Sequence, residues 1–342
     1  MDKIDFVLTW VDGNDKEWLE LKRKYEISDS KVRSTDPEAN ADCRYRDYGL
    51  LKYWFRGVER FAPWVNRVFF VTCGQKPDWL DESNPKLRLV NHRDFIPAEY
   101  LPTFQGRPIE LNLHRIKDLS EHFVYFNDDM FLLRPVKSDF YFKKGLPVIS
   151  CDLGIPRWLS YSNIGRIIIN NCGVLKQNLD VERLVWKNIW KYINIRSLGF
   201  GRAAKNLVSF AINRTVIPGT FGHQPSAQLK STFDEIWCTV PKIMDDTSRC
   251  RFRSDYCVNP WLLSSWNMIS GRFYPANEKR TGHYFVFNTN SLSRICETIR
   301  MQSYPQLCLN DKAIGSAEME KCIHEVSQAF DTILPEKSSF EK

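Results

Sequence analysis

The chain has no run of apolar residues that is long enough to cross a bilayer as a helix. Its opening residues, MDKIDFVLTW, alternate charged with apolar side chains, which is not the pattern of a secretory signal peptide. Both absences favour a cytoplasmic protein, and any contact with a membrane is expected to be peripheral, at its inner face.

The ten cysteines include no C-x-x-C pair, which argues against the common zinc and redox motifs. Several of them, including Cys73, Cys151 and Cys308, sit in apolar runs. We therefore expect reduced thiols packed in a cytoplasmic core, with a disulfide framework as the less favoured alternative.

Several nucleotide-binding and nucleic-acid-binding motifs are also missing. The sequence contains neither a P-loop nor a G-x-G-x-x-G fingerprint, so nothing suggests a kinase or a dehydrogenase. It has no arginine-rich arm and no zinc-finger spacing, so no nucleic acid is expected as a partner. The net charge of +7 is compatible with an anionic substrate, an anionic polymer or a membrane surface, and selects none of them. The oligomeric state is not indicated by any feature.

What is present is an alternation of strand and helix signals over 342 residues, enough for a large core. Apolar, β-branched runs predict strands at residues 4–10, 68–73, 87–90, 123–133 and 147–151. Helical periodicity is clearest over 44–61 and 108–120. This order predicts an α/β fold with a mostly parallel, Rossmann-like (GT-A-like) sheet flanked by helices.

The composition changes near Trp158, where helical and basic character begins. We predict an α/β core built from residues 1–152 and 220–342, interrupted by a basic helical insertion at 153–219. Solvation is the default interpretation for such a basic face, and an acceptor or membrane surface is the functional alternative.

The most informative stretch is FVYFNDDMFLL, residues 123–133. An apolar run that ends in Asn127, Asp128 and Asp129 reads as a buried strand whose carboxyl end opens into a site. Two adjacent carboxylates between apolar flanks are costly unless a cation pairs with them, and oxygen ligands suit Mg²⁺ or Mn²⁺. An Asx turn with solvated side chains is the structural alternative.

Two other predicted strands also end in acidic or amide residues. Ile4–Trp10 leads into Asp12, Asn14 and Asp15, and Leu307–Leu309 leads into Asn310 and Asp311. In a parallel sheet such strand ends meet, so Thr9–Asp15 is a candidate ligand loop, although Asp15 also suits a helix N-cap.

Basic and imidazole side chains lie in loops elsewhere. These are Arg44, Arg46, His223, Arg253 and Arg280. Carboxylates for a hard cation, arginines for phosphate and a histidine for proton transfer are the parts that phosphoryl chemistry needs. The residues alone therefore indicate a metal-dependent enzyme that acts on a phosphorylated ligand.

Over most of its length the sequence resembles the Stealth family of sugar-1-phosphate transferases, which includes bacterial capsule polymerases and the catalytic part of N-acetylglucosamine-1-phosphotransferase. The resemblance rests on IDFVLTWVDGND, on the long ordered block from RYRDYG to FNDDMFL, on GHQP with RFRSD, and on CLND. It implies transfer of a hexose-1-phosphate from a UDP-sugar donor to a glycan hydroxyl in capsule or other cell-surface polysaccharide synthesis, with release of UMP.

The resemblance also implies roles for individual residues. Asp128 and Asp129 would hold Mg²⁺ (or Mn²⁺) against the donor diphosphate, His223 would be the general base, and Arg253 would neutralise charge on the transferred group. Asp255 would orient His223 or Arg253. The donor pocket is assigned Thr9, Trp10, Asp12, Asn14, Arg44, Arg46, Asn127, Arg280, Asn310 and Asp311.

Two alternatives remain open on the sequence. A GT-A glycosyltransferase also uses strand-end aspartates and a divalent ion, but it transfers the sugar alone and releases UDP. A non-catalytic carbohydrate-binding protein needs only exposed aromatic side chains, and it has no turnover to lose on mutation of Asp128.

Overall fold

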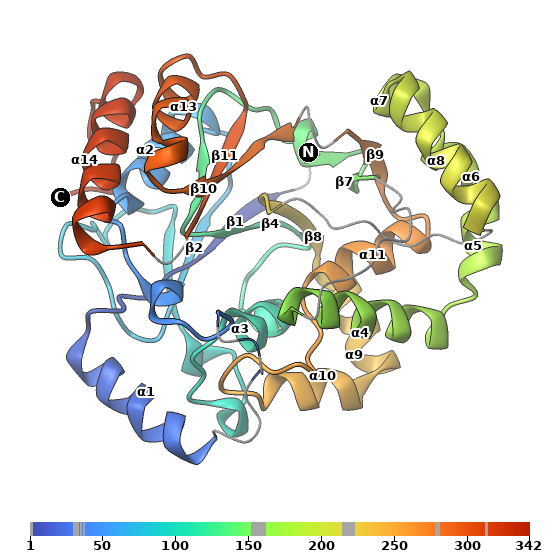
Figure 1. Cartoon of the computed structure of the whole chain (residues 1–342), viewed down its shortest axis with the longest axis horizontal. Coiled ribbons are helices and arrows are strands. Elements are labelled where there is room, and N and C mark those ends of the chain that lie inside the picture. Colours follow the sequence, from blue (N-terminus) through green and yellow to red (C-terminus); the bar gives the residue numbers. More distant parts are fainter. Residues whose placement is uncertain are drawn as a thin grey trace.

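The computed structural model describes residues 3–29, 34, 36, 38–151, 162–213, 223–277, 281–311 and 314–342. The fold is built around a five-stranded sheet with the strand order β3-β2-β1-β4-β8 (Figure 1). Its strands are β1 (Ile4–Thr9), β2 (Val68–Thr72), β3 (Leu87–Asn91), β4 (His122–Asn127) and β8 (Ser226–Leu229). The first four are parallel and β8 is antiparallel to β4, so the predicted α/β, mostly parallel sheet is confirmed.

Both faces of the sheet are buried at the central strands β1, β2 and β4, which explains why these strands read as largely apolar runs. Phe6, Leu8 and Phe70 point into one hydrophobic cluster. Val7 and Phe69, next to them in sequence, point into a second cluster on the other face. The alternation follows from strand geometry, because successive side chains leave opposite faces.

Helices cover the two faces. Those that pack on the side of the first cluster are α2 (Leu51–Phe61), α13 (Thr289–Arg300) and α14 (Ser316–Ile333). The second cluster is covered by α3 (Gly106–Asn112), α9 (Lys230–Thr239), α10 (Pro241–Ser248) and α11 (Trp261–Ile269). Figure 1 shows the two groups on opposite sides of the strands, with α1 (Lys16–Ser28) at the lower edge.

Two small sheets extend the core. β10 (His283–Phe287), β11 (Gln306–Asp311) and β5 (Met130–Leu132) form one, and β6 (Phe142–Lys143), β7 (Leu146–Ser150) and β9 (Tyr274–Ala276) form the other. The apolar stretch 123–133 was predicted as one strand, and this is wrong: the chain turns at Asp128-Asp129, and β5 leaves for a different sheet from β4. The carboxylates thus lie in the connection between two sheets.

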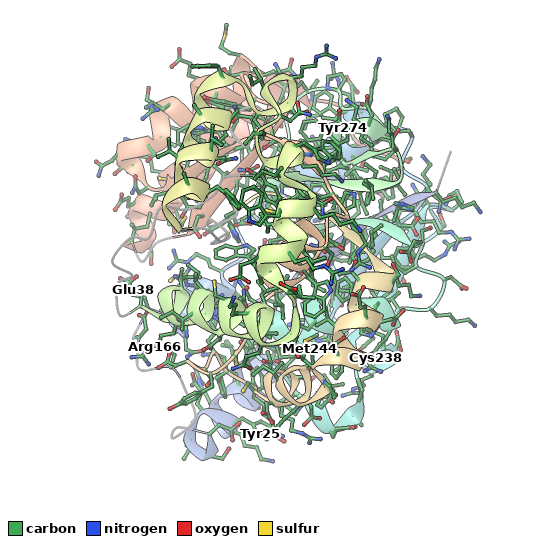
Figure 2. The ribbon with its side chains drawn as sticks, turned by 90° about the vertical axis from the view of Figure 1, so that its right-hand side faces the viewer. Tyr25, Glu38, Arg166, Cys238, Met244 and Tyr274 are labelled. Atoms are coloured by element: carbon green, nitrogen blue, oxygen red, sulfur yellow. The ribbon has the colours of Figure 1, made fainter. Side chains whose placement is uncertain are left out.

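The described part of the middle segment, residues 162–213, consists of α4 (Asn163–Asn178), α5 (Val181–Lys187), α6 (Ile189–Tyr192), α7 (Ile195–Leu198) and α8 (Phe200–Asn213) with short turns. Figure 1 shows α5 to α8 along the right-hand edge of the molecule, and these helices face the viewer in Figure 2. The division of the chain into domains at 152 and 219 stays a prediction.

Some predicted boundaries need correction. The helix predicted to begin at Arg44 begins at Leu51, and Arg44 lies in a 3-10 turn, Asp42–Tyr45, that precedes it. The helix predicted over 108–120 ends as an α-helix at Asn112 and continues only as a 3-10 turn.

All ten cysteines lie in the described part of the chain as free thiols, with Cys151 and Cys308 buried and Cys73 partly buried. Among the helices that the structure describes, none is long and apolar enough to span a bilayer.

Candidate active site

The site lies where the direction of strand addition reverses. From β1 the chain adds β2 and β3 on one side, and it later adds β4 on the other. The carboxyl ends of β1 and β4 are therefore neighbours, with Thr9 paired to Asn127. Such reversal points leave a crevice in which α/β proteins bind ligands. A cavity of about 690 Å³ opens there, and it is lined by Thr9, Trp10, Asn127, Asp128 and Asp129 among others.

The turn between β4 and β5 holds two carboxyls at this cavity. Leu309 on β11 donates its backbone N–H to the carbonyl of Asp129 at 2.8 Å, which fixes the turn against the second sheet. Burial raises the pKa of Asp128 well above its ordinary value, and the charges of Asp129 and Asp47 raise it further. Oδ1 of Asp129 is buried and has no hydrogen-bond partner among the described residues.

Asp47 is a third carboxyl of this cluster that sequence reasoning did not select. Burial raises its pKa, the hydrogen bond from Gly49 lowers it, and the charge of Asp12 raises it again. Its Oδ1 accepts a hydrogen bond from the backbone N–H of Gly49 at 3.1 Å. Asp47 lies in RYRDYG, inside the range 44–61 that was predicted to be helical, and it was not among the selected site residues.

This cluster fits a hard divalent cation. A carboxyl, Asp128, whose pKa is raised by burial and by two neighbouring carboxyls, together with an orphaned oxygen on Asp129, is the arrangement that an oxygen-bound Mg²⁺ or Mn²⁺ relieves. Asp129, His223 and Cys308 also bring one ligand atom each within 4.8 Å of the others. Burial and the Asp129 charge raise the pKa of Cys308 well above its ordinary value, however, and the thiol hydrogen-bonds Asp129 Oδ2 at 3.4 Å. A thiol that keeps its proton is a poor metal ligand.

His223 lies against this cluster, although it is distant in sequence. Its Nε2 is 3.4 Å from Oδ2 of Asp129 and 3.4 Å from Nδ2 of Asn127. Burial disfavours the charged imidazole, but Asp129 and then Glu110 overcome this, so the pKa of His223 is raised. A histidine in this setting is poised to accept a proton.

Glu110 is a functional candidate that sequence reasoning missed. It lies on α3, lines the cavity, and has a pKa that burial raises. The Tyr125 hydroxyl donates to Oε1 of Glu110 at 2.9 Å and is 2.9 Å from Oγ1 of Thr9. The same hydroxyl is 2.5 Å from Oδ1 of Asn127. These contacts tie α3 to the ends of β1 and β4.

Arginines converge on the same cavity. Burial and the charges of Arg107 and Arg44 lower the pKa of Arg253 to about 10, so the three guanidiniums lie close together. No carboxylate of the described residues forms an ion pair with Arg253. A cluster of arginines in which Arg253 has no ion-pair contact with a carboxylate of the described residues is suited to an anion such as phosphate.

The backbone around Arg253 is held rigidly. Asn40 donates from Nδ2 to the Arg253 carbonyl at 3.2 Å and accepts from the Arg253 N–H at 2.9 Å. Gln105 donates from Nε2 to the carbonyls of Cys250 and Phe252 at 2.6 and 2.8 Å. The guanidinium is therefore carried on a loop with little freedom to move.

The remaining predicted site residues fall into three groups. Those that line the cavity are Thr9, Trp10, Arg44, Arg46, Asn127 and Asn310. Asp12 and Asn14 do not line it: the Asp12 side chain accepts from the Asn14 backbone at 2.9 Å, and Asn14 is exposed. Arg280 and the side chain of Asp311 lie outside the described residues.

Asp255 occupies a different position from the one expected. It binds Arg166 on α4, Nδ2 of Asn163 at 3.1 Å and the Ser34 hydroxyl at 2.5 Å. Figure 2 shows Arg166 on the lower left of that view. The carboxyl group that, besides Asp129, raises the pKa of His223 is Glu110. The predicted orienting role of Asp255 stays a prediction.

The sequence matches known proteins along its whole length. The model of Stealth protein conserved region 1 matches residues 2–30, and that of conserved region 2 matches residues 44–149. The capsular polysaccharide phosphotransferase WcwK of Streptococcus pneumoniae is 40% identical over 100% of both chains. The receptor polysaccharide phosphotransferase WefC of Streptococcus gordonii is 37% identical over 100% of this chain and 99% of its own. The chain belongs to the Stealth family. The predicted third and fourth family blocks, around His223 with Arg253 and at Asn310, stay predictions.

Among solved structures, the galactosyltransferase LgtC in complex with donor and acceptor sugar analogs aligns over 96% of both chains. The sequence identity is 9% and the TM-score is 0.42.

Proposed function

We propose that this chain is a polysaccharide phosphotransferase that moves a hexose-1-phosphate from a UDP-sugar to a hydroxyl of a glycan acceptor. The acceptor oxygen forms a bond to the β-phosphorus of the donor, the bond from that phosphorus to the bridging oxygen breaks, and UMP leaves. The names of the full-length relatives support a phosphotransferase of cell-surface polysaccharides. The observation that carries the proposal is that one cavity is lined both by the carboxyls of Asp128 and Asp129 and by the arginines Arg44, Arg107 and Arg253.

The carboxyl cluster supports donor binding through a cation. Asp128 and Asp129 would hold Mg²⁺ or Mn²⁺, with Asp47 beside them. Such an ion, when bound, neutralises charge on a diphosphate and on the leaving nucleotide. Thr9 and Trp10 at the end of β1 would line the nucleotide-sugar subsite.

His223 is the group best suited to receive the acceptor proton. One of its ring nitrogens must be free of a proton when the acceptor hydroxyl arrives, and the negative charges of Asp129 and Glu110 then stabilise the imidazolium that forms. Arg253, with Arg107 and Arg44 nearby, would balance the charge that develops on the transferred phosphoryl group.

The experiment that tests this function identifies the released nucleotide. The protein is incubated with a panel of UDP-sugars, Mg²⁺ and candidate glycans, nucleotides are separated by chromatography, and products are read by phosphorus NMR. UMP together with a phosphodiester resonance on the glycan supports the proposal. Release of UDP with a glycosidic product contradicts it in favour of a glycosyltransferase. Sugar binding without turnover on any pair contradicts it in favour of a carbohydrate-binding protein. Asp129→Asn serves as the inactive control.

A further inference from the structure

Helix α8 carries large apolar side chains on the side that faces solvent. Phe200, Leu207 and Val208 recur at a helical spacing of seven and eight residues, so they share one stripe. That stripe faces solvent, with exposed fractions of 76%, 53% and 53%. The opposite face includes the polar Asn206, which is fully buried. A surface helix normally shows the reverse pattern.

The inward orientation of α8 is fixed by hydrogen bonds. Nδ2 of Asn206 donates to the carbonyl of Cys151 at 2.9 Å and to the carbonyl of Tyr192 on α6 at 2.8 Å. On the same helix Phe210 is buried, and its ring meets the ring of Trp186 on α5 with 4.6 Å between the centroids. Asn206 and Phe210 thus hold one side of α8 against the protein, which leaves the stripe of Phe200, Leu207 and Val208 exposed to solvent.

The neighbouring helices continue this character. Trp186 on α5, Trp190 on α6 and Ile195 on α7 are all more than half exposed. Together with Phe200, Leu207 and Val208 they form what we call the outer apolar face. Figures 1 and 2 show that the four helices that carry it lie on one outer side of the molecule. Isolated exposed apolar residues are normal, but a gathering of large ones on one side of a protein marks a binding surface.

The same segment has a strongly positive net charge. Residues 181–213 contain six lysines and arginines and a single acidic residue, Glu182. Arg183, Lys187 and Arg196 are exposed between the apolar side chains. Most of the excess positive charge of the whole chain, +7, thus lies on these helices.

We propose that the outer apolar face binds the surface of an anionic phospholipid bilayer, with α8 lying in the interface. Tryptophan, phenylalanine and leucine beside lysine and arginine are the composition of helices that lie in a membrane interface, where the apolar groups enter the acyl boundary and the cations meet lipid phosphates. A second copy of this chain is a poorer occupant, because two such faces would bring like charges together. A glycan is also poorer, because Ile195, Leu207 and Val208 offer no hydrogen bonds to sugar hydroxyls.

This face is separate from the catalytic cavity. None of its six residues lines that cavity. A hydrogen bond holds α7, which carries Ile195 of this face, to the rest of the protein. Asn277, next to β9, donates from Nδ2 to the carbonyl of Leu198 on α7 at 2.8 Å. Membrane binding and catalysis can therefore be tested independently.

The test is co-sedimentation with lipid vesicles, which needs no substrate. Wild-type protein is expected to bind vesicles of phosphatidylglycerol and phosphatidylcholine, and to bind vesicles of phosphatidylcholine alone at least ~10-fold more weakly. Leu207→Ser with Val208→Ser is expected to weaken binding at least ~10-fold, and so is the triple variant Arg183→Gln, Lys187→Gln, Arg196→Gln. Met301→Ser, which changes an apolar side chain of comparable exposure elsewhere, should bind like wild type.

Three results would overturn the inference. The first is wild-type protein that does not sediment with anionic vesicles. The second is wild-type binding retained by both variants. The third is a dimer, seen by sedimentation velocity without lipid, that Leu207→Ser with Val208→Ser dissociates. Because the altered side chains are exposed, the variants should keep the wild-type melting temperature and turnover.

Discussion

At the scale of single residues, electrostatic cost is concentrated in the turn Asp128-Asp129. Burial and the charges of Asp129 and Asp47 oppose the ionisation of Asp128 and raise its pKa, and one oxygen of Asp129 is buried without a partner among the described residues. Such a cluster lowers the stability of the fold unless a ligand offsets its charge, and a bound cation is the simplest ligand that does so.

We expect Asp128→Asn and Asp129→Asn each to lower turnover by about 100-fold or more, because each removes a ligand charge at the reacting diphosphate. Both variants should melt at or above the wild-type temperature in the presence of a chelator, since each removes like-charge repulsion. Steady-state kinetics and calorimetry give the two readouts. Asp78→Asn, on an exposed loop, is the matched control. Near-normal turnover of either cluster variant would contradict the assignment.

Most of the site residues were predictable from sequence because they carry a local signal. Asp128 and Asp129 interrupt an apolar run, and the histidine and arginine loops have glycine, proline or aromatic neighbours. Glu110 carries none: it is a single acid on a short helix, and only the approach of Tyr125 and Thr9 reveals its place. Asp255 had a local signal in RFRSD, but its contact with Arg166 on α4 is long-range and left no mark in the sequence.

A second prediction concerns His92, whose pKa burial lowers from 6.5 to about 4. The unfolded chain binds a proton at this imidazole below about pH 6.5, and the folded chain does not until about pH 4. The contribution of the neutral His92 imidazole to the free energy of unfolding is therefore complete above about pH 6.5, and it is lost as the pH falls from there to about 4. The free energy of unfolding should lose on the order of 2 kcal/mol from this group between pH 7 and pH 5.

Denaturant titrations at a series of pH values test this. His92→Gln should reduce the slope of unfolding free energy against pH over this range, whatever its effect at pH 7. The exposed His324→Gln should leave the slope unchanged. An equal slope in His92→Gln and wild type would show that the imidazole takes up its proton without unfolding.

At the scale of elements, the strands β1, β2, β3 and β7 were predictable to within a residue or two, and runs such as VFFVT are buried on both faces and leave little choice. Helix boundaries were less so. Helix α4 contains glycines and adjacent asparagines, which have weak helix propensity. It is helical because the Ser162 side chain caps it and its polar side chains, such as Asn171, find partners on neighbouring segments.

Asn206 offers a test of how α8 is held. Asn206→Ala removes two buried hydrogen bonds, so the free energy of unfolding should fall by about 1–3 kcal/mol. Hydrogen exchange should quicken first in α6 to α8. In Asn178→Ala the lost hydrogen bond, to the carbonyl of Val174, is exposed, and the expected cost is below about 0.5 kcal/mol. An equal loss of unfolding free energy in the two variants would contradict the claim that the Asn206 hydrogen bonds fix the orientation of α8.

At the scale of the whole molecule, the last residues of the chain pack against helix α2, which lies near the start of the sequence. Arg56 on α2 donates from Nε and Nη2 to the two carboxylate oxygens of Glu341, each at 2.8 Å, and from Nη1 to the carbonyl of Leu334 at 3.0 Å. Phe340 packs on Phe55 with 5.2 Å between the ring centroids. No local pattern predicts such a pairing, because its partners are 285 residues apart.

Glu341→Gln should therefore destabilise the whole protein. Both side chains are almost fully buried, and the substitution leaves the Arg56 charge with only Asp331, whose Oδ1 lies 4.0 Å from Nη1, as counter-ion, at a cost of up to about 3–5 kcal/mol. Chemical denaturation measures it, and Glu336→Gln, at an exposed position of the same segment, is the control. A loss no larger than that of the control would mean that the pair contributes little to the stability of the fold.

The account depends most directly on a divalent ion held at Asp128 and Asp129 against a nucleotide-sugar, and Mn²⁺ titration followed by electron paramagnetic resonance measures this. The wild-type protein should bind Mn²⁺, more tightly when a UDP-sugar is present, and Asp129→Asn should weaken that binding by about 10-fold or more. Binding of Mn²⁺ that is equal in wild type and Asp129→Asn, or that is indifferent to the UDP-sugar, would contradict it.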